Sequence, residues 1–283
     1  MEQIKLYRTT GGIYACYKDT YYKMKGEWDA LVNRESLFSA IKADIAGLPA
    51  ENGVAAEIEN SLLAPIGSQE IWAAGVTYYR SRVARMEESE MPVGATYYDL
   101  VYHAERPELF FKSTAARVAG PGQPVCIRRD SEWNVPEPEL TLFINSEGNI
   151  QGYTVGNDMS SRSIEGENPL YLPQAKVYEK SAAIGPCLMV PEHPIPSDTC
   201  IHMKIFRSGE LQYKDEVPIS QMKREHGSLA AYLYRECAFP AGCYLMTGTC
   251  LVPPNEFTLQ EGDVVEISID HIGVLVNKVR AGK

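Results

Sequence analysis

The feature that most constrains this chain is a long succession of strand-like segments from Pro107 onward. The segments are rich in β-branched and aromatic residues, which favour strands over helices. They include LFFKST (109–114), PVCIRR (124–129), PELTLFI (138–144) and DVVEISID (263–270). Turn-forming sequences such as GPG (120–122), SEGN (146–149) and EGD (261–263) separate them. Many strands with few long helices predict a β-rich α+β fold with a barrel or a folded-over sheet.

The first 68 residues differ in pattern and predict a small N-terminal module (1–68) ahead of a larger catalytic domain (69–283). IKLYRT (4–9) and IYACYKD (13–19) predict two strands joined at Gly11 and Gly12. The sequence 36–48 has helical spacing, with Ser36 placed as its N-cap. A buried strand is expected over 70–79, followed by a charged helix over 77–90.

Composition excludes several classes of protein. The 283 residues carry a formal charge of −10 and no basic run, so we expect no nucleic-acid partner. No apolar run reaches the roughly 18 residues needed to span a membrane, and the N-terminus has no signal-peptide core. The seven cysteines include no CxxC pair, which favours reduced thiols and a cytoplasmic location. The five histidines form no HxxxH or HExxH motif, so a helical zinc site is not expected.

Three carboxylates in the stretch 135–163 are the most informative candidates. Glu137 and Glu139 are two apart in a predicted strand, so both side chains lie on one face. SEGN predicts a hairpin turn after that strand. With a two-residue loop, Asp158 falls opposite Glu137 or Glu139, and all three carboxylates share a face. A three-residue loop would break this parity unless a β-bulge restored it.

Three carboxylates on one face repel one another unless something compensates their charge. A divalent cation would do so, and all-oxygen ligands favour Mg²⁺, with Mn²⁺ or Ca²⁺ as alternatives. The other interpretation is an exposed hairpin whose carboxylates are solvated. TVGND (154–158) is apolar for an exposed strand, and Asp158 sits at a strand-to-helix junction, where functional groups gather.

The sequence resembles the fumarylacetoacetate hydrolase family over residues 70–280. The matching motifs, in chain order, are GVTYY (75–79), LFFKST (109–114), EPEL (137–140), VGNDMSSR (155–162), AIGP (183–186), LMTGT (245–249) and EGDVVEISIDHIGVLVNKV (261–279). The resemblance implies a mixed β-roll, a homodimer or homotetramer, and a Mg²⁺ ion bound by Glu137, Glu139 and Asp158. It also implies a small 2-keto acid substrate that binds through adjacent keto and carboxylate oxygens.

Two departures narrow the activity within that family. Hydrolytic members use a His–Glu dyad, but this chain has Arg82 and Arg85 at the corresponding places in TYYRSRVARM (77–86). Arginine cannot act as a general base near neutral pH. The segment SRSIEGENPLYLPQAKVY (161–178) resembles instead a subgroup that dehydrates 2-keto-3-deoxy sugar acids, such as 2-keto-3-deoxy-arabinonate. The expected product is then a 2,5-dioxo acid.

The chemistry assigns provisional roles to the remaining polar residues. A lysine near a cation can titrate low enough to act, so Lys176 is expected to handle protons or to stabilise an enolate. Glu165 is a second acid–base candidate, with a solvated loop charge as the alternative. Candidate substrate contacts are Arg82, Lys112 and Thr249. Alternatively, Arg82 forms a surface ion pair, Lys112 pairs with an acidic metal ligand, and Thr249 is only a turn residue.

Three hypotheses follow from these observations. The first is a metal-dependent hydro-lyase that acts on a 2-keto-3-deoxy sugar acid. The second is a hydrolase of fumarylacetoacetate-like or acylpyruvate-like diketo acids with a base not identified in the sequence. It predicts a histidine near the metal. The third is a non-enzymatic binding protein, which the complete set of three carboxylates disfavours.

Overall fold

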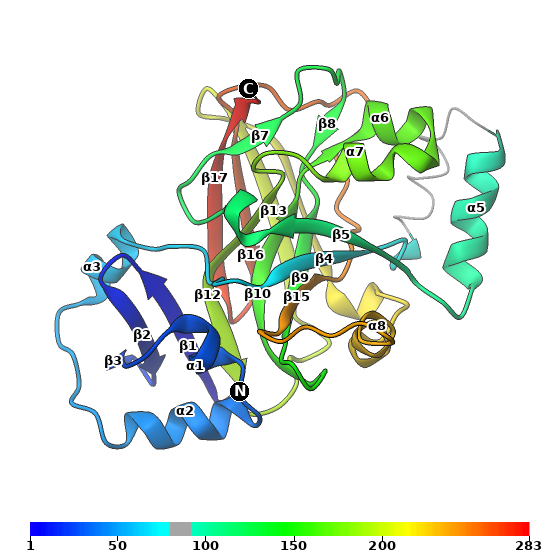
Figure 1. Cartoon of the computed structure of the whole chain (residues 1–283). Coiled ribbons are helices and arrows are strands. Elements are labelled where there is room, and N and C mark those ends of the chain that lie inside the picture. Colours follow the sequence, from blue (N-terminus) through cyan, green and yellow to red (C-terminus); the bar gives the residue numbers. More distant parts are fainter. Residues whose placement is uncertain (80–91, 283) are drawn as a thin grey trace.

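A ten-stranded mixed sheet forms the centre of the molecule (Figure 1). A computed structural model of the chain describes residues 1–79 and 92–282. The strands of the central path run in the order β3 (Thr20–Met24), β2 (Gly12–Tyr17), β1 (Gln3–Thr9), β12 (Ala182–Pro191), β10 (Ile150–Asp158), β9 (Pro138–Ile144), β15 (Cys243–Met246), β4 (Glu70–Gly75) and β5 (Glu108–Thr114). The short β6 (Val118–Ala119) pairs with β12. The prediction of a β-rich α+β fold with a folded sheet is confirmed.

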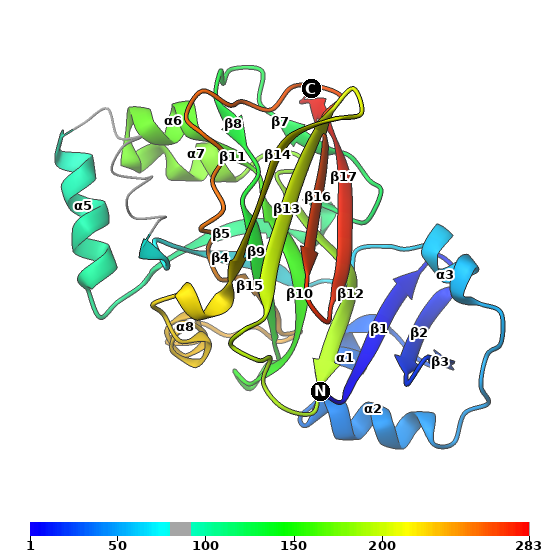
Figure 2. The ribbon, with the colours of Figure 1, turned by 180° about the vertical axis from the view of Figure 1, so that it is seen from behind.

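A second sheet of five strands packs across the first (Figure 2). Its order is β14 (Glu210–Pro218), β13 (Cys200–Arg207), β16 (Val264–Ile269), β17 (Gly273–Ala281) and β7 (Val125–Ile127). Leu142 of β9, Met203 of β13 and Ile267 of β16 are buried together in the core between the two sheets. A separate pair, β8 (Asn134–Val135) and β11 (Ser160–Ser161), lies beside the end of β10.

A second core covers the opposite face of the large sheet. Phe143, next in sequence to Leu142, points into this core together with Leu6 of β1 and Ile41 of α2. Because both faces are covered, every residue of β9 is buried. A strand buried on both faces reads as a nearly continuous apolar run, as TLFI does here. Its polar residues therefore cannot reach bulk water.

The helices are short and lie around the sheets. They are α1 (Trp28–Val32), α2 (Leu37–Ile45), α3 (Ala55–Asn60), α5 (Pro92–His103), α6 (Arg162–Glu167), α7 (Leu172–Lys176) and α8 (His226–Leu233). The predicted helix at 36–48 is confirmed as α2, but Ser36 has φ +47° and its side chain makes no cap hydrogen bond. The predicted helix over 77–90 falls mostly outside the described residues, and α5 was not predicted. No helix in the described ranges is long and apolar enough to cross a membrane.

The N-terminal strands continue the large sheet. Leu6 of β1 pairs with Leu188 of β12 in an antiparallel ladder, and β2 and β3 extend the sheet outward from β1. Figure 1 shows these blue strands with α2 to one side of the body. Main-chain hydrogen bonds therefore join the predicted module 1–68 to the rest of the chain. The division at residue 68 stays a prediction.

Candidate metal centre

The hairpin of β9 and β10 brings the three predicted carboxylates together. Thr141 pairs with Thr154 and Glu139 with Gly156, so paired residue numbers sum to 295 near the site. At the turn, however, Ile144 pairs with Ile150, and a register shift follows between Ile150 and Gly152. The connection is thus longer than the two residues expected, and the bulge restores the expected parity.

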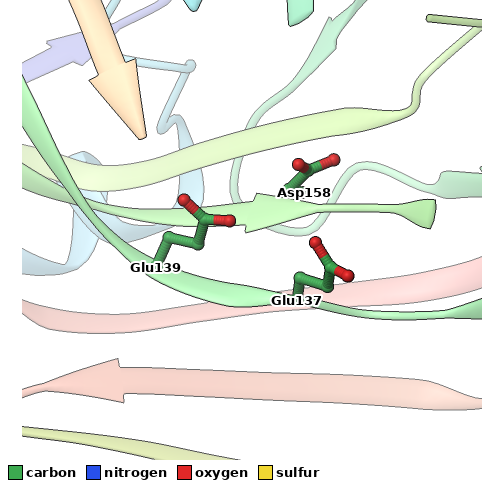
Figure 3. Close-up of side chains that lie close together, drawn as sticks. All are labelled: Glu137, Glu139 and Asp158. Carbon is green, nitrogen blue, oxygen red and sulfur yellow. The ribbon is translucent and has the colours of Figure 1, made fainter. Parts of the chain in front are cut away.

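The carboxylates face one another at the end of this hairpin (Figure 3). One oxygen from each of Glu137, Glu139 and Asp158 lies within 4.8 Å of the others. Their relative exposures are only 3%, 2% and 1%, which excludes the alternative of solvated carboxylates on an exposed hairpin. Buried carboxylates require partners that carry positive charge or donate hydrogen bonds.

Asp158 is compensated by two buried lysines. The Lys176 ammonium lies 3.1 Å from Asp158, and Lys112 forms an ion pair with the other oxygen of the same carboxylate. Burial acts to raise the pKa of Asp158, but the two ammonium groups hold it below its ordinary value. Burial also lowers the pKa of Lys112 to about 8, although Asp158 opposes that shift. Asp158 is therefore held in its charged form.

The ammonium groups of both lysines contact acceptors within the protein. Lys176 donates to Glu137 Oε2 at 2.5 Å and Ser160 Oγ at 2.6 Å, in addition to Asp158. Lys112 donates to the Met159 carbonyl at 2.9 Å and the Lys176 carbonyl at 2.6 Å, and it forms the ion pair with Asp158 described above. An ammonium group has three N–H donors, so each lysine has as many protein partners as it has donors. This geometry favours the interpretation of Lys112 as the partner of an acidic ligand.

Glu137 and Glu139 differ in their surroundings. Arg162 at the start of α6 donates to Glu137 Oε1 at 2.7 Å, and Lys176 contacts the other oxygen. Glu139 accepts a hydrogen bond from the main-chain N–H of Gly248. Burial, together with the charges of Asp158 and Glu137, raises the pKa of Glu139 well above its ordinary value. Additional positive charge beside Glu139 would stabilise its ionised form.

The donor set fits a hard divalent cation. Three carboxylates offer only oxygen ligands, which suits Mg²⁺, Mn²⁺ and Ca²⁺. Three cationic side chains, Lys112, Lys176 and Arg162, balance the three acids. A divalent ion would therefore leave the site with an excess of positive charge, which would attract an anionic ligand.

A cavity opens onto these groups. Its lining includes Phe110 of β5, Gly75 and Val76 at the end of β4, and Gly248 and Thr249 after β15. Thr249 is 6% exposed, and its hydroxyl accepts from the Leu251 N–H. Glu165 is buried on α6 but is not among the described residues that line this cavity. Arg82 lies outside the described residues.

One acidic residue beside the cavity residue Gly75 was missed from the sequence. Glu108, the first residue of β5, pairs with Gly75, and its carboxylate fills the space that a side chain at Gly75 would occupy. Its Oε2 is buried and has no hydrogen-bond partner in the structure. Period-two spacing could have found it, because Glu108 and the cavity residue Phe110 share one face of β5.

The fold and this carboxylate centre define the class of protein. The model of the fumarylacetoacetate (FAA) hydrolase C-terminal family matches residues 71–280. The chain belongs to the fumarylacetoacetate hydrolase family, as its motifs predicted.

Two relatives in this family carry dehydratase names. A probable 2-keto-3-deoxyxylonate dehydratase of Haloferax volcanii is 51% identical over 223 residues, which cover 78% of this chain and 76% of the relative. A 2-dehydro-3-deoxy-D-arabinonate dehydratase of Saccharolobus solfataricus is 40% identical over 218 residues, covering 76% and 73%. The structure of 2-keto-3-deoxy-D-arabinonate dehydratase complexed with magnesium and 2,5-dioxopentanoate aligns over 100% of both chains, with a TM-score of 0.85 and 30% identity.

Proposed function

We propose that this chain is a divalent-metal-dependent dehydratase that converts a 2-keto-3-deoxy sugar acid, such as 2-keto-3-deoxy-arabinonate, into a 2,5-dioxo acid. The observation that carries this proposal is the buried trio of carboxylates balanced by three cations. The relatives that are 51% and 40% identical support the reaction class and the kind of substrate.

Glu137, Glu139 and Asp158 would hold the cation, and Mg²⁺ is the metal in the related dehydratase complex. When bound, such an ion supplies a Lewis acid that draws electrons from a keto oxygen and makes the neighbouring C–H group more acidic. The surrounding lysines and Arg162 keep the acidic ligands ionised and in place. The carboxylate of a 2-keto acid suits the excess positive charge of the loaded site.

Glu108 is the residue we assign as the proton acceptor. A general base needs a free lone pair close to the substrate, and the buried Oε2 of Glu108, which lies beside the cavity residue Gly75, offers one. Lys112 and Lys176 have their N–H donors engaged by protein acceptors, so losing a proton would break those contacts. Glu137 and Asp158 are already bound by cations.

Lys176 then has an electrostatic role as a fixed positive charge that favours negative charge developing on the substrate. Its contacts with Glu137 and Asp158 keep the ammonium at the edge of the cavity. Thr249 lines the cavity and is a candidate contact for the acid end of the substrate. The acid–base role of Glu165 and substrate contacts by Arg82 and Lys112 stay predictions.

The reaction balances without an oxidant or a hydrolytic water. Glu108 takes a proton from C3, and the C3–H electron pair forms a double bond to C4. The C4 hydroxyl leaves with its bonding electrons and takes up the proton held by Glu108, which gives one water molecule and returns Glu108 to its ionised form. One proton then moves from C5 to C3 and another from the C5 hydroxyl to C4, which gives the aldehyde of a 2,5-dioxo acid.

The alternative, hydrolysis of fumarylacetoacetate-like or acylpyruvate-like acids, predicts a histidine near the metal. All five histidines lie in the described ranges 1–79 and 92–282, and none of them lines the cavity. The dehydratase therefore fits this site better than a hydrolase that uses a His–Glu dyad.

The test is direct incubation of the purified chain and Mg²⁺ with 2-keto-3-deoxy-pentonates and -hexonates, followed by NMR of the products. We expect a 2,5-dioxo acid, and a kcat for Glu108→Gln that is lower by about 10²- to 10⁴-fold. Cleavage of acylpyruvates without any dehydration would overturn the proposal. We also propose a cytoplasmic location and a homodimer or homotetramer, which size-exclusion chromatography with light scattering would test.

A further inference from the structure

A short strap, residues 222–224, touches the backbone on both sides of the candidate base. It follows the 3-10 helix Ile219–Gln221 and precedes α8. On one side lies the end of β4, whose Gly75 and Val76 line the cavity. On the other side lies the end of α5, which leads into β5 and Glu108. No role for the strap follows from the activity proposed above.

The first half of the strap binds the residues that follow β4. The Lys223 N–H donates to the Thr77 carbonyl at 2.9 Å, and Met222 forms an antiparallel bridge with Tyr78. The Thr77 hydroxyl in turn donates to the Thr247 carbonyl at 2.7 Å, beside the metal-centre glycine Gly248. The strap is therefore anchored to residues that directly neighbour the cavity residues Val76 and Gly248.

The second half of the strap binds the end of α5. The Arg224 guanidinium donates to three main-chain carbonyls, those of Val101 at 2.9 Å, Ala104 at 2.7 Å and Glu105 at 2.8 Å. Val101 lies in the last turn of α5, whose carbonyls lack partners within the helix, and Ala104 and Glu105 directly follow the helix. By binding all three carbonyls, Arg224 fixes how the chain leaves α5. The Lys223 ammonium also donates to the Tyr102 carbonyl and lies 4.2 Å from the Tyr102 ring centre.

We propose that Arg224 is a positioning residue that acts through Glu108. Glu105 is three residues before Glu108, so the carbonyls bound by Arg224 set where β5 begins and where the Glu108 carboxylate lies against Gly75. Lys223 holds the other side of that contact by binding Thr77, two residues after Gly75. The inference rests on the proposed function, because Glu108 is the base only if a C3 proton is removed.

The expected effect follows from geometry. A displacement of about 1 Å at a catalytic group can reduce a rate by about 10²-fold. Arg224 contacts none of the carboxylates that would hold the metal, so binding of the metal and of the 2-keto acid should change little. The signature is therefore a loss in kcat with KM nearly unchanged, which general destabilisation of the fold would not produce at temperatures well below the Tm.

The first experiment measures kcat and KM for the Mg²⁺-loaded enzyme on a 2-keto-3-deoxy-pentonate. We expect Arg224→Ala to lower kcat by about 10- to 100-fold, with KM and the Mg²⁺ affinity within about twofold. Arg224→Lys should restore part of the rate, because one ammonium can bind some of the same carbonyls. The matched control is Arg129→Ala, an exposed arginine between β7 and β8, which should leave kcat unchanged.

A double-mutant cycle separates positioning from a merely structural role. If Arg224 acts through Glu108, adding Arg224→Ala to Glu108→Gln should lower kcat by less than about twofold further. A loss that multiplies in the double mutant overturns the proposal, as does a single mutant with kcat within twofold of the parent.

The proposal is also testable if no sugar acid is dehydrated. Hydrogen–deuterium exchange of the peptide covering 104–112 should be faster in Arg224→Ala than in Arg129→Ala. The rate at which the Mg²⁺-loaded enzyme exchanges the C3 protons of 2-oxobutyrate with D₂O should be lower for Arg224→Ala than for Arg129→Ala. Absence of dehydration by the parent enzyme would overturn the proposed function alone. Unchanged amide exchange at 104–112 would overturn the role of Arg224.

Discussion

Glu137 and Asp158 exchange two main-chain hydrogen bonds across the hairpin, 3.2 Å from Glu137 N to Asp158 O and 2.9 Å from Asp158 N to Glu137 O. This pairing places their side chains next to each other on one face, where a ladder without a compensating charge would be destabilised. Their buried partners Lys112, Lys176 and Arg162 carry positive charge that compensates the repulsion between the two carboxylates.

Loss of one carboxylate should strongly weaken metal binding. We expect Asp158→Asn to weaken Mg²⁺ binding by more than about 100-fold, because changes outside the ligand shell already cost about 10- to 100-fold. Isothermal titration calorimetry on metal-stripped protein measures this affinity. The control is Asp130→Asn, an exposed carboxylate bound by Arg128 at 2.8 and 2.6 Å, which should leave the affinity unchanged. Equal affinities for the two variants would contradict the assignment.

Removing the charge of Lys176 should destabilise the metal-free protein. Lys176→Met leaves the Glu137 and Asp158 carboxylates without one of their buried cations, at a cost of about 3–5 kcal/mol. Added Mg²⁺ should recover part of that free energy, because it supplies positive charge at the same place. Urea unfolding with and without Mg²⁺ measures both effects. The control is Lys214→Met, at an exposed lysine of β14, which should change neither unfolding curve. Unfolding curves for Lys176→Met that match those of Lys214→Met would refute the prediction.

Gly248 should tolerate no side chain. It has φ +96°, and a Cβ there would lie 2.9 Å from the Ala74 carbonyl and would collide with the Thr77 hydroxyl. Gly248→Ala should cost about 1–3 kcal/mol more in unfolding free energy than Gly209→Ala. Gly209 has a similar φ of +84° but open space around its Cβ position. Gly209→Ala therefore measures the cost of backbone strain without the steric collision. Because the Gly248 N–H binds Glu139, Mg²⁺ affinity should also fall in Gly248→Ala only.

Asp270 should stabilise the fold in a pH-dependent way. Burial acts to raise the pKa of Asp270, but the Cys200 N–H and His202 hold it below its ordinary value. A folded-state pKa below the unfolded one gives stability that is present above about pH 4 and is lost as the pH falls. Asp270→Asn should therefore lower the Tm by about 1–3 °C at pH 7 and by less near pH 3.5, as measured by calorimetry. The same Tm difference at both pH values would speak against this contact.

Predictions from the sequence succeeded where local periodicity decides the structure. The strands β1 and β2, the helix α2 and the hairpin of β9 and β10 follow from patterns within a few residues. The actual loop was not predictable, because a bulge after Ile150 compensates for its greater length. The helix α5 was not predicted either, since valine and tyrosine residues in 92–103 favour helices only weakly.

The sequence by itself determined that Glu137, Glu139 and Asp158 share one face, because side chains in a strand alternate with a period of two. Only the tertiary structure decided which groups surround them. Lys112 and Gly248 come from strands and loops remote in the chain, and the base candidate Glu108 lies against the cavity residue Gly75 only because that residue has no side chain. Such contacts depend on how the sheet is assembled and on small differences in packing, which no local pattern of residues encodes.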